Sequence, residues 1–195
     1  MAAKPPPPVS RTAVNANLMI VLRPKSDLDE RYILLIESPQ ARARNELYLE
    51  FPKGAFDASG YFTGPMMDDL RQETNFKLSK DHLINLTAVV QKTQPSTCEP
   101  GSHIEPAVRS IRANPNTTVL LWEKYMDRKE IEAFKGRFAG RRAPNEASNI
   151  RMLEYEDFCE RSTRTMELEH GRSIYECLVI CGILEQYLRE KRIGK

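Results

Sequence analysis

The stretch that decides the fold is Leu47–Phe76, which reads LYLEFPKGAFDASGYFTGPMMDDLRQETNF. Its first five residues alternate in polarity, which predicts a short strand that Pro52-Lys53-Gly54 ends. A loop rich in Gly, Asp and Ser is expected to follow as far as Gly64. Pro65 suits the first turn of a helix, because its missing N–H costs nothing there. The helix is predicted to run to about Phe76, with Asn75 as a left-handed C-cap.

The predicted helix carries a stripe of oxygen-bearing side chains. Asp69, Gln72 and Glu73 are spaced i, i+3 and i+4, which places them on one helical face, with Asp68 beside it. Oxygen ligands of this kind suit Mg²⁺. Taken alone, such a stripe is also typical of a solvated helix face, so both interpretations stay open. The core side of the helix is expected to be covered by Met66, Met67, Leu70 and Phe76.

These residues resemble the box of the Nudix hydrolases, whose pattern is G-x5-E-x7-R-E-U-x-E-E-x-G-U with U aliphatic. Aligned without a gap, the sequence matches the pattern at Gly54, Leu70 and Glu73. It departs at Gly60 (for Glu), Asp68 (for Arg), Asp69 (for Glu), Gln72 (for Glu), Asn75 (for Gly) and Phe76 (for an aliphatic residue). The preceding segment Glu50–Asp57 is similar to the E-(L/F)-P-(A/K)-G-x-x-D approach of ADP-ribose and other nucleoside-diphosphate-sugar diphosphatases.

The resemblance implies an α/β fold of the Nudix type, a mixed β-sheet sandwiched between α-helices. It implies hydrolysis of the diphosphate bond in a nucleoside diphosphate linked to another moiety, such as ADP-ribose or an ADP-sugar, with Mg²⁺ or Mn²⁺. The metal ligands carried over are Gly54, Asp69, Gln72 and Glu73. The catalytic residues carried over are Glu73 and Asp69, with Glu146 in the region where the family often places an additional catalytic Glu; an exposed loop carboxylate is the other interpretation of Glu146. Lys53, which precedes the box glycine, and Arg141 and Arg142, whose guanidinium groups can pair with phosphate oxygens, are the candidate substrate-binding residues. A solvated cluster is the other interpretation of the two arginines. Because the Gln72 amide is uncharged, we expect the metal site to bind ions with lower affinity, or to bind fewer of them, than a site with two glutamates.

A second hypothesis belongs to another functional class. The departures from the box at Gly60, Asp68, Gln72 and Asn75 favour a Nudix-like fold without hydrolysis. Such a protein would bind a nucleotide, act as a scaffold or subunit of a larger assembly, or use the old pocket for different chemistry.

The remaining chain predicts alternating strands, loops and helices. Strands are expected at Asn17–Leu22, Tyr32–Ile36, Leu83–Val90, Thr117–Trp122 and Asn149–Leu153. Loops are expected at Thr93–Asn116 and at the basic segment Gly136–Ser148, and a short helix or turn at Lys129–Phe134. The apolar stripe of Ser173–Leu188 predicts a final amphipathic helix. Mixed strands with few helices indicate an α/β domain.

Length and composition limit the class of protein. The 195 residues suit one domain, predicted at residues 15–195, behind a flexible proline-rich tail at residues 1–14. A net charge of +2 gives no reason to expect binding to nucleic acid. No apolar run approaches the roughly 18 residues that span a bilayer. We expect a cytoplasmic protein, with a mitochondrial address left open. Its expected partner is a small nucleoside-diphosphate derivative, and the resemblance leaves a homodimer open.

Overall fold

The computed structural model describes residues 16–39, 47–92, 118–143 and 146–158, together with Leu184 and Tyr187. The predicted tail, the loop predicted at Thr93–Asn116 and most of the predicted final helix lie outside these residues. The described strands are β1 (Ala16–Pro24), β2 (Tyr32–Pro39), β3 (Leu47–Glu50), β4 (Lys53–Phe56), β5 (Phe62–Thr63), β6 (Ile84–Asn85), β7 (Thr118–Met126), β8 (Phe138–Ala143) and β9 (Glu146–Glu154). The described helices are α1 (Pro65–Thr74), η1 (Lys80–His82), α2 (Leu86–Lys92) and α4 (Arg128–Glu132).

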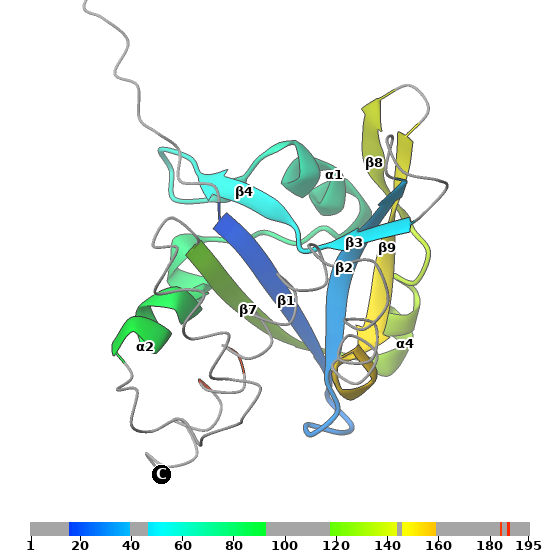
Figure 1. Ribbon diagram of the computed structural model, residues 1–195. Coiled ribbons are helices and arrows are strands. Elements are labelled where there is room, and N and C mark those ends of the chain that lie inside the picture. Colours follow the sequence, from blue (N-terminus) through cyan, green and yellow to red (C-terminus); the bar gives the residue numbers. More distant parts are fainter. Residues whose placement is uncertain are drawn as a thin grey trace, which may run out of the picture.

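The described strands form a mixed sheet around β1 (Figure 1). β1 pairs with β7 in parallel along its whole length, and β2 pairs with β9 in antiparallel. β1 and β2 pair only where Ile20–Leu22 meet Tyr32–Leu34. Beyond that point β3 pairs with β2, and β4 pairs with β1. The chain therefore passes from β3 to β4 where β1 and β2 separate, and the backbone N–H of Leu18 donates to Pro52 O at 2.8 Å there.

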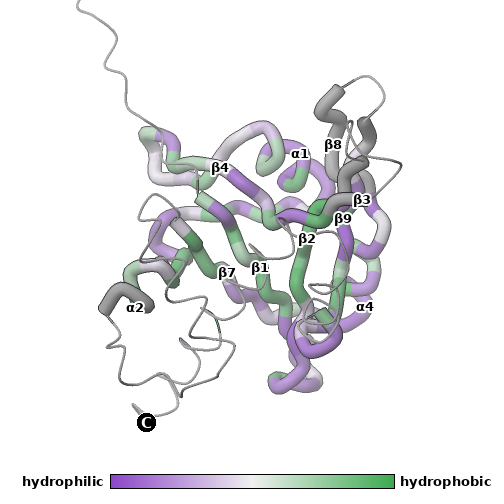
Figure 2. The backbone as a smooth tube through the Cα atoms, in the orientation of Figure 1, coloured by the Kyte–Doolittle hydropathy of each residue, from purple (hydrophilic) through white to green (hydrophobic). Residues whose placement is uncertain are grey.

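Hydrophobic side chains gather on both faces of the sheet. Successive residues of a strand point to opposite faces, so β1 contributes Leu18 and Ile20 to one cluster and Met19 and Val21 to the other. The first cluster is completed by Met67 and Leu70 of α1, Ile131 of α4 and Phe134 in the turn that follows α4. The second is completed by Leu86, Leu184 and Tyr187. Figure 2 shows the apolar residues concentrated along the central strands. No helix within the described ranges is long and apolar enough to cross a membrane.

Most of the predicted elements are confirmed in place. The strand predicted at Leu47–Phe51 is β3, which ends one residue earlier, at Glu50. The strands predicted to begin at residues 17, 32, 117 and 149 overlap β1, β2, β7 and β9. The predicted short helix is α4, which begins after Asp127 with a capping box between Asp127 and Glu130. Leu184 and Tyr187 have helical conformation, as the amphipathic pattern predicts.

The strand predicted at Leu83–Val90 is wrong beyond its third residue. The structure has a two-residue strand, β6, followed by the helix α2. Asn85 is the physical reason, because its Oδ1 accepts a hydrogen bond from the Ala88 N–H at 2.9 Å. That contact is typical of an N-cap, which starts a helix even in a sequence rich in β-branched residues.

Two predicted loops contain strands. The loop predicted before Gly64 is the β4–β5 hairpin, whose turn is closed by Asp57: its Oδ1 accepts from Ser59 N at 2.8 Å and Tyr61 N at 3.0 Å. The loop predicted at Gly136–Ser148 is the β8–β9 hairpin, with register shifts between the two strands. β8 has little apolar character, which is typical of a strand at the edge of a sheet.

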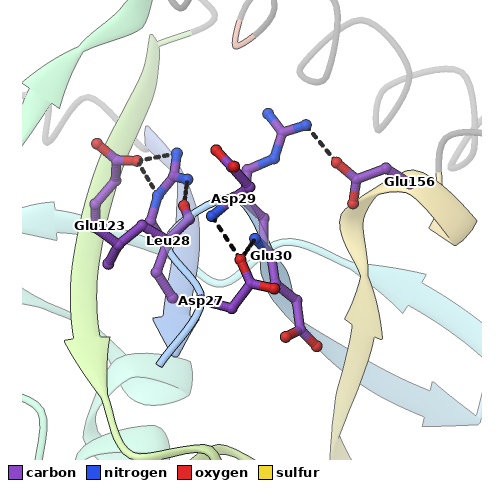
Figure 3. A network of polar contacts seen from close by, with 8 residues as sticks. Asp27, Leu28, Asp29, Glu30, Glu123 and Glu156 are labelled. Atoms are coloured by element: carbon purple, nitrogen blue, oxygen red, sulfur yellow. Dashed lines mark hydrogen bonds and ion pairs between the residues drawn. The ribbon is translucent and has the colours of Figure 1, made fainter. Parts of the chain in front are cut away.

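Charged side chains organise the turn between β1 and β2 (Figure 3). Arg23 pairs with Glu123 of β7 at 3.1 Å and donates to the Leu28 carbonyl at 2.7 Å. Asp27 accepts hydrogen bonds from the N–H groups of Asp29 and Glu30. These contacts lie at the C-terminal end of β1, whereas β4 pairs with its N-terminal end, so we interpret them as a structural network.

Tyr32 links this turn to α4, because its hydroxyl accepts a hydrogen bond from Arg128. Its ionisation makes the stability of the fold depend on pH in the alkaline range. Burial, and the hydrogen bond that its hydroxyl donates to Glu30, raise the pKa of Tyr32 from 10.0 to about 12. The protonated phenol therefore contributes stability that is fully present below pH 10.0 and is lost as pH rises to about 12. We expect Tyr32→Phe to flatten the fall of the unfolding free energy across this window, measured by urea denaturation. An equally steep fall in the variant would contradict this origin.

Candidate active site

The helix α1 is confirmed with the termini that the sequence signals. Pro65 occupies the first turn, and the N–H of Asp68 donates to Gly64 O at 2.8 Å. The helix ends at Thr74, slightly before the predicted end, and Asn75 adopts the left-handed conformation with φ 56°. The Asn75 N–H then donates to Arg71 O at 2.8 Å, as expected of a C-cap.

The orientation of α1 follows from which residues it buries. Met67, Leu70 and Thr74 face the core, whereas Asp69 and Glu73 are half-buried. Residues 66, 69 and 73 recur at i, i+3 and i+7 and so form one stripe along the helix. Met66 Sδ accepts a hydrogen bond from the Lys53 N–H at 3.2 Å. The flank that carries Asp69 and Glu73 is therefore turned toward the start of β4.

Gln72 and Asp68 lie farther from this flank than the helical spacing alone predicts. Both are exposed, whereas Asp69 and Glu73 are half-buried. Asp68 forms an ion pair with Arg71 at 3.5 Å. The positive charge of Arg71 therefore offsets the repulsion between the adjacent carboxylates of Asp68 and Asp69. Arg71 also donates to Phe62 O at 3.4 Å, which places it on the opposite flank, toward β5.

Glu50 is a candidate site residue that the sequence does not predict. It lies directly opposite Ile36 in the β2–β3 pair, and residues so paired share a face of the sheet. Ile36 belongs to the cluster beneath α1, so the Glu50 carboxylate is on the α1 side. Its residue is only 7% exposed, and its Oε2 lies 3.5 Å from Lys53 Nζ. A charged residue inside a short alternating strand was the available signal.

The predicted metal-binding residues are thus partly assembled. Asp69 and Glu73 lie on one flank of α1, and that flank faces the segment that holds Glu50 and Lys53. Their carboxylate oxygens are hard donors, which fit Mg²⁺ or Mn²⁺ in chemical type. As the side chains stand, no three Asp, Glu, His or Cys residues of the described chain are close enough together to hold a metal ion.

Gly54 has a packing role at the predicted position of close approach. A Cβ added there would lie 2.4 Å from Thr63 O and 3.1 Å from Met67 Cγ. The first distance is far below any real contact, so only glycine lets β4 lie this close to β5 and α1. Its proposed part in metal binding stays a prediction.

The remaining predicted residues belong to the β8–β9 hairpin, which contacts α1. Arg141 and Arg142 are in β8, and Glu146 is the first residue of β9, so all three are in strands and not in the predicted loop. Figure 1 shows α1 between β4 and this hairpin. The side chains of these three residues lie outside what the structure describes, so their proposed contacts with substrate stay predictions.

Comparison with known proteins gives one relevant similarity. No protein-family model matches the chain. A search of curated proteins finds Nudix hydrolase 14, chloroplastic, of Arabidopsis thaliana, which is 26% identical over 148 residues. The match covers 75% of this chain but 45% of the relative, so the chain spans less than half the length of that protein. Together with a mixed α/β fold of few helices, this similarity supports a relationship to the Nudix hydrolases.

Proposed function

We propose that this protein is a metal-dependent hydrolase of the Nudix type. It would cleave the diphosphate bond of a nucleoside diphosphate linked to another moiety. The simplest substrate would be ADP-ribose or an ADP-sugar. The proposed compartment is the cytoplasm. The observation that carries the proposal is the placement of Asp69 and Glu73. Both are half-buried on the flank of α1 that faces the start of β4, whereas Asp68 and Gln72 are exposed.

The described residues divide the chemistry among them. Asp69 and Glu73 would hold Mg²⁺ or Mn²⁺ through carboxylate oxygens. When bound, the cation would neutralise charge on the diphosphate and make a water molecule more acidic. Lys53 would supply an ammonium group to the diphosphate; its Nζ lies 3.5 Å from Glu50 Oε2, and its backbone N–H contacts Met66 on the same flank of α1. An ammonium group is a suitable point charge for a phosphate oxygen.

Residues of the β8–β9 hairpin complete the proposal. Glu146 is proposed as a general base, which would take a proton from the attacking water. Arg141 and Arg142 are proposed to bind phosphate oxygens, because a guanidinium group pairs with them in a bidentate manner. The hairpin contacts α1, so these residues belong to the same region of the fold.

The direct test is incubation of the full chain with ADP-ribose and Mg²⁺, followed by detection of AMP and ribose 5-phosphate. Water adds across the phosphorus–oxygen bond, so the two products should appear in equal amounts. A chelator should abolish the reaction, and added Mn²⁺ should restore it. Absence of AMP from ADP-ribose and from a panel of ADP-sugars would exclude the proposal.

Gln72 tests how the departure from the box affects metal dependence. We expect Gln72→Glu to lower the Mg²⁺ concentration needed for half-maximal activity, because it adds a carboxylate one turn from Asp69 and beside Glu73. The measurement is a Mg²⁺ titration of the initial rate. Lys129→Gln, at an exposed position of α4, makes the same change of net charge away from the site and serves as the control. An unchanged Mg²⁺ dependence would place Gln72 outside the site, in agreement with its exposure.

The alternative, a Nudix-like fold without hydrolysis, is favoured by the structural roles of the departures from the box. Gly60 has φ 81° in the β4–β5 turn, Asp68 pairs with Arg71, and Asn75 caps α1. Each of these residues serves the fold. Failure to bind Mn²⁺, together with stable co-purification of one partner, would select the alternative. Gel filtration of the purified chain would test the homodimer.

A further inference from the structure

Arg137, in the connection between α4 and β8, makes a contact that neither the box nor the proposed reaction accounts for. Its Nη1 donates to the Glu73 carbonyl oxygen at 2.9 Å, and its Nε donates to the Ala133 carbonyl oxygen at 2.6 Å. The guanidinium carbon lies 5.2 Å from the centre of the Phe134 ring. A single exposed side chain therefore joins the last turn of α1 to the end of α4.

The contact supplies what the C-terminus of α1 lacks. The last four carbonyl groups of a helix have no partner within it. At this end the Arg71 carbonyl accepts from the Asn75 N–H, whereas the Glu73 carbonyl accepts from Arg137. A positive charge at a helix C-terminus is also favourable to the helix dipole.

Arg137 is itself fixed by the sheet. The Gly136 N–H donates to Ile150 O at 3.0 Å, and the Ile150 N–H donates to Arg137 O at 2.6 Å. Gly136 has φ 74°, a conformation that suits glycine at such a tight turn. Arg137 therefore links β9, through its backbone, to the Glu73 carbonyl, through its guanidinium group.

We propose that Arg137 is a positioning residue that fixes the last turn of α1, and with it the Glu73 carboxylate, for metal binding and hydrolysis. The inference rests on the proposed function. It assigns Arg137 a role through Glu73, with no contact to the substrate. Arg137 bonds to the backbone carbonyl of Glu73 and not to its carboxylate, so this contact leaves the carboxylate available as a ligand.

The test compares Arg137→Ala and Arg137→Lys with Lys135→Ala, which removes one positive charge from an exposed position two residues away. The readouts are kcat, KM and the Mg²⁺ half-saturation with ADP-ribose, Mn²⁺ affinity from electron paramagnetic resonance, and the midpoint of urea unfolding. We expect Arg137→Ala to weaken Mn²⁺ binding and kcat by about 10- to 100-fold, the usual range when a group that orients a metal ligand is lost. KM should stay close to that of Lys135→Ala, and the unfolding midpoint should fall only by the small amount expected for one exposed contact at a helix end.

Arg137→Lys should recover part of the loss. An ammonium group can donate to the Glu73 carbonyl but lacks the planar fork that also reaches Ala133. Equal Mn²⁺ affinity in Arg137→Ala and Lys135→Ala would overturn the inference, whether or not ADP-ribose is hydrolysed. If Arg137→Ala loses activity only because a larger fraction of the protein is unfolded, as a large drop in its unfolding midpoint would show, the role of Arg137 is purely structural and the inference is overturned. If the wild-type chain binds Mn²⁺ but releases no AMP, the proposed function fails while the Mn²⁺ comparison still tests Arg137.

Discussion

Glu73→Gln is expected to lower kcat about 100-fold or more, because Glu73 is proposed to hold the cation. A bound cation stabilises the transition state by several kcal/mol, and about 1.4 kcal/mol corresponds to a factor of ten in rate. Glutamine keeps the size of the side chain and removes its charge. Glu73 is half-buried on the flank of α1 that faces Lys53, and its backbone carbonyl is held by Arg137 independently of the side chain. The substitution should therefore affect the chemistry and not the helix.

Initial rates with ADP-ribose, together with urea unfolding, check this expectation. Glu132→Gln makes the same chemical change at an exposed position in α4 and should retain wild-type activity. Asp69→Asn should resemble Glu73→Gln, because both residues lie on the same stripe of α1. A Glu73→Gln protein that keeps a kcat within twofold of wild type would remove Glu73 from the active site.

Phe76→Ala is expected to lower the free energy of unfolding by about 3–5 kcal/mol, the usual cost of deleting a buried aromatic ring. Phe76 is 3% exposed and directly follows the C-cap of α1. Its ring lies 4.9 Å from the Trp122 ring and 5.4 Å from the Phe134 ring, centre to centre. Lys124 Nζ lies 4.7 Å from the same ring, so a cation–π contact is lost as well.

Urea denaturation followed by tryptophan fluorescence measures this loss, since Trp122 is a direct neighbour. Tyr125→Ala is the matched control, because Tyr125 is 53% exposed on β7. Its effect should stay within about 0.5 kcal/mol, as for most surface substitutions. A loss in Phe76→Ala no larger than the roughly 0.5 kcal/mol expected of Tyr125→Ala would show that the Phe76 ring does not hold the core together.

Local signals in the sequence predict those elements that are specified by neighbouring residues. Pro65 and Asn75 mark the ends of α1 with their own backbone preferences, and the apolar runs of β1 and β7 indicate buried strands. The fold class follows from these elements. The burial of Met67 and Leu70 likewise follows from helical periodicity alone.

Elements and site residues that depend on distant partners were not predictable in this way. β8 is a strand because β9 pairs with it, and its own residues carry little apolar signal. The position of Glu50 on the α1 side depends on its pairing with Ile36. Helical spacing makes Gln72 a neighbour of Glu73, but the contact between Lys53 and Met66, which are distant in sequence, shows which flank of α1 lies next to the start of β4.

Gly54 has a consequence for how the molecule opens. An added Cβ at Gly64 would lie 3.4 Å from Gly54 Cα, and one at Gly54 would meet Thr63 O at 2.4 Å, so main chain lies against main chain. Because no side chain separates Gly54 from Thr63 and Gly64, the β4–β5 hairpin and the start of α1 cannot shift independently of each other. We expect their amide protons to exchange with deuterium together, as one cooperative unit, instead of fraying from the hairpin tip inward.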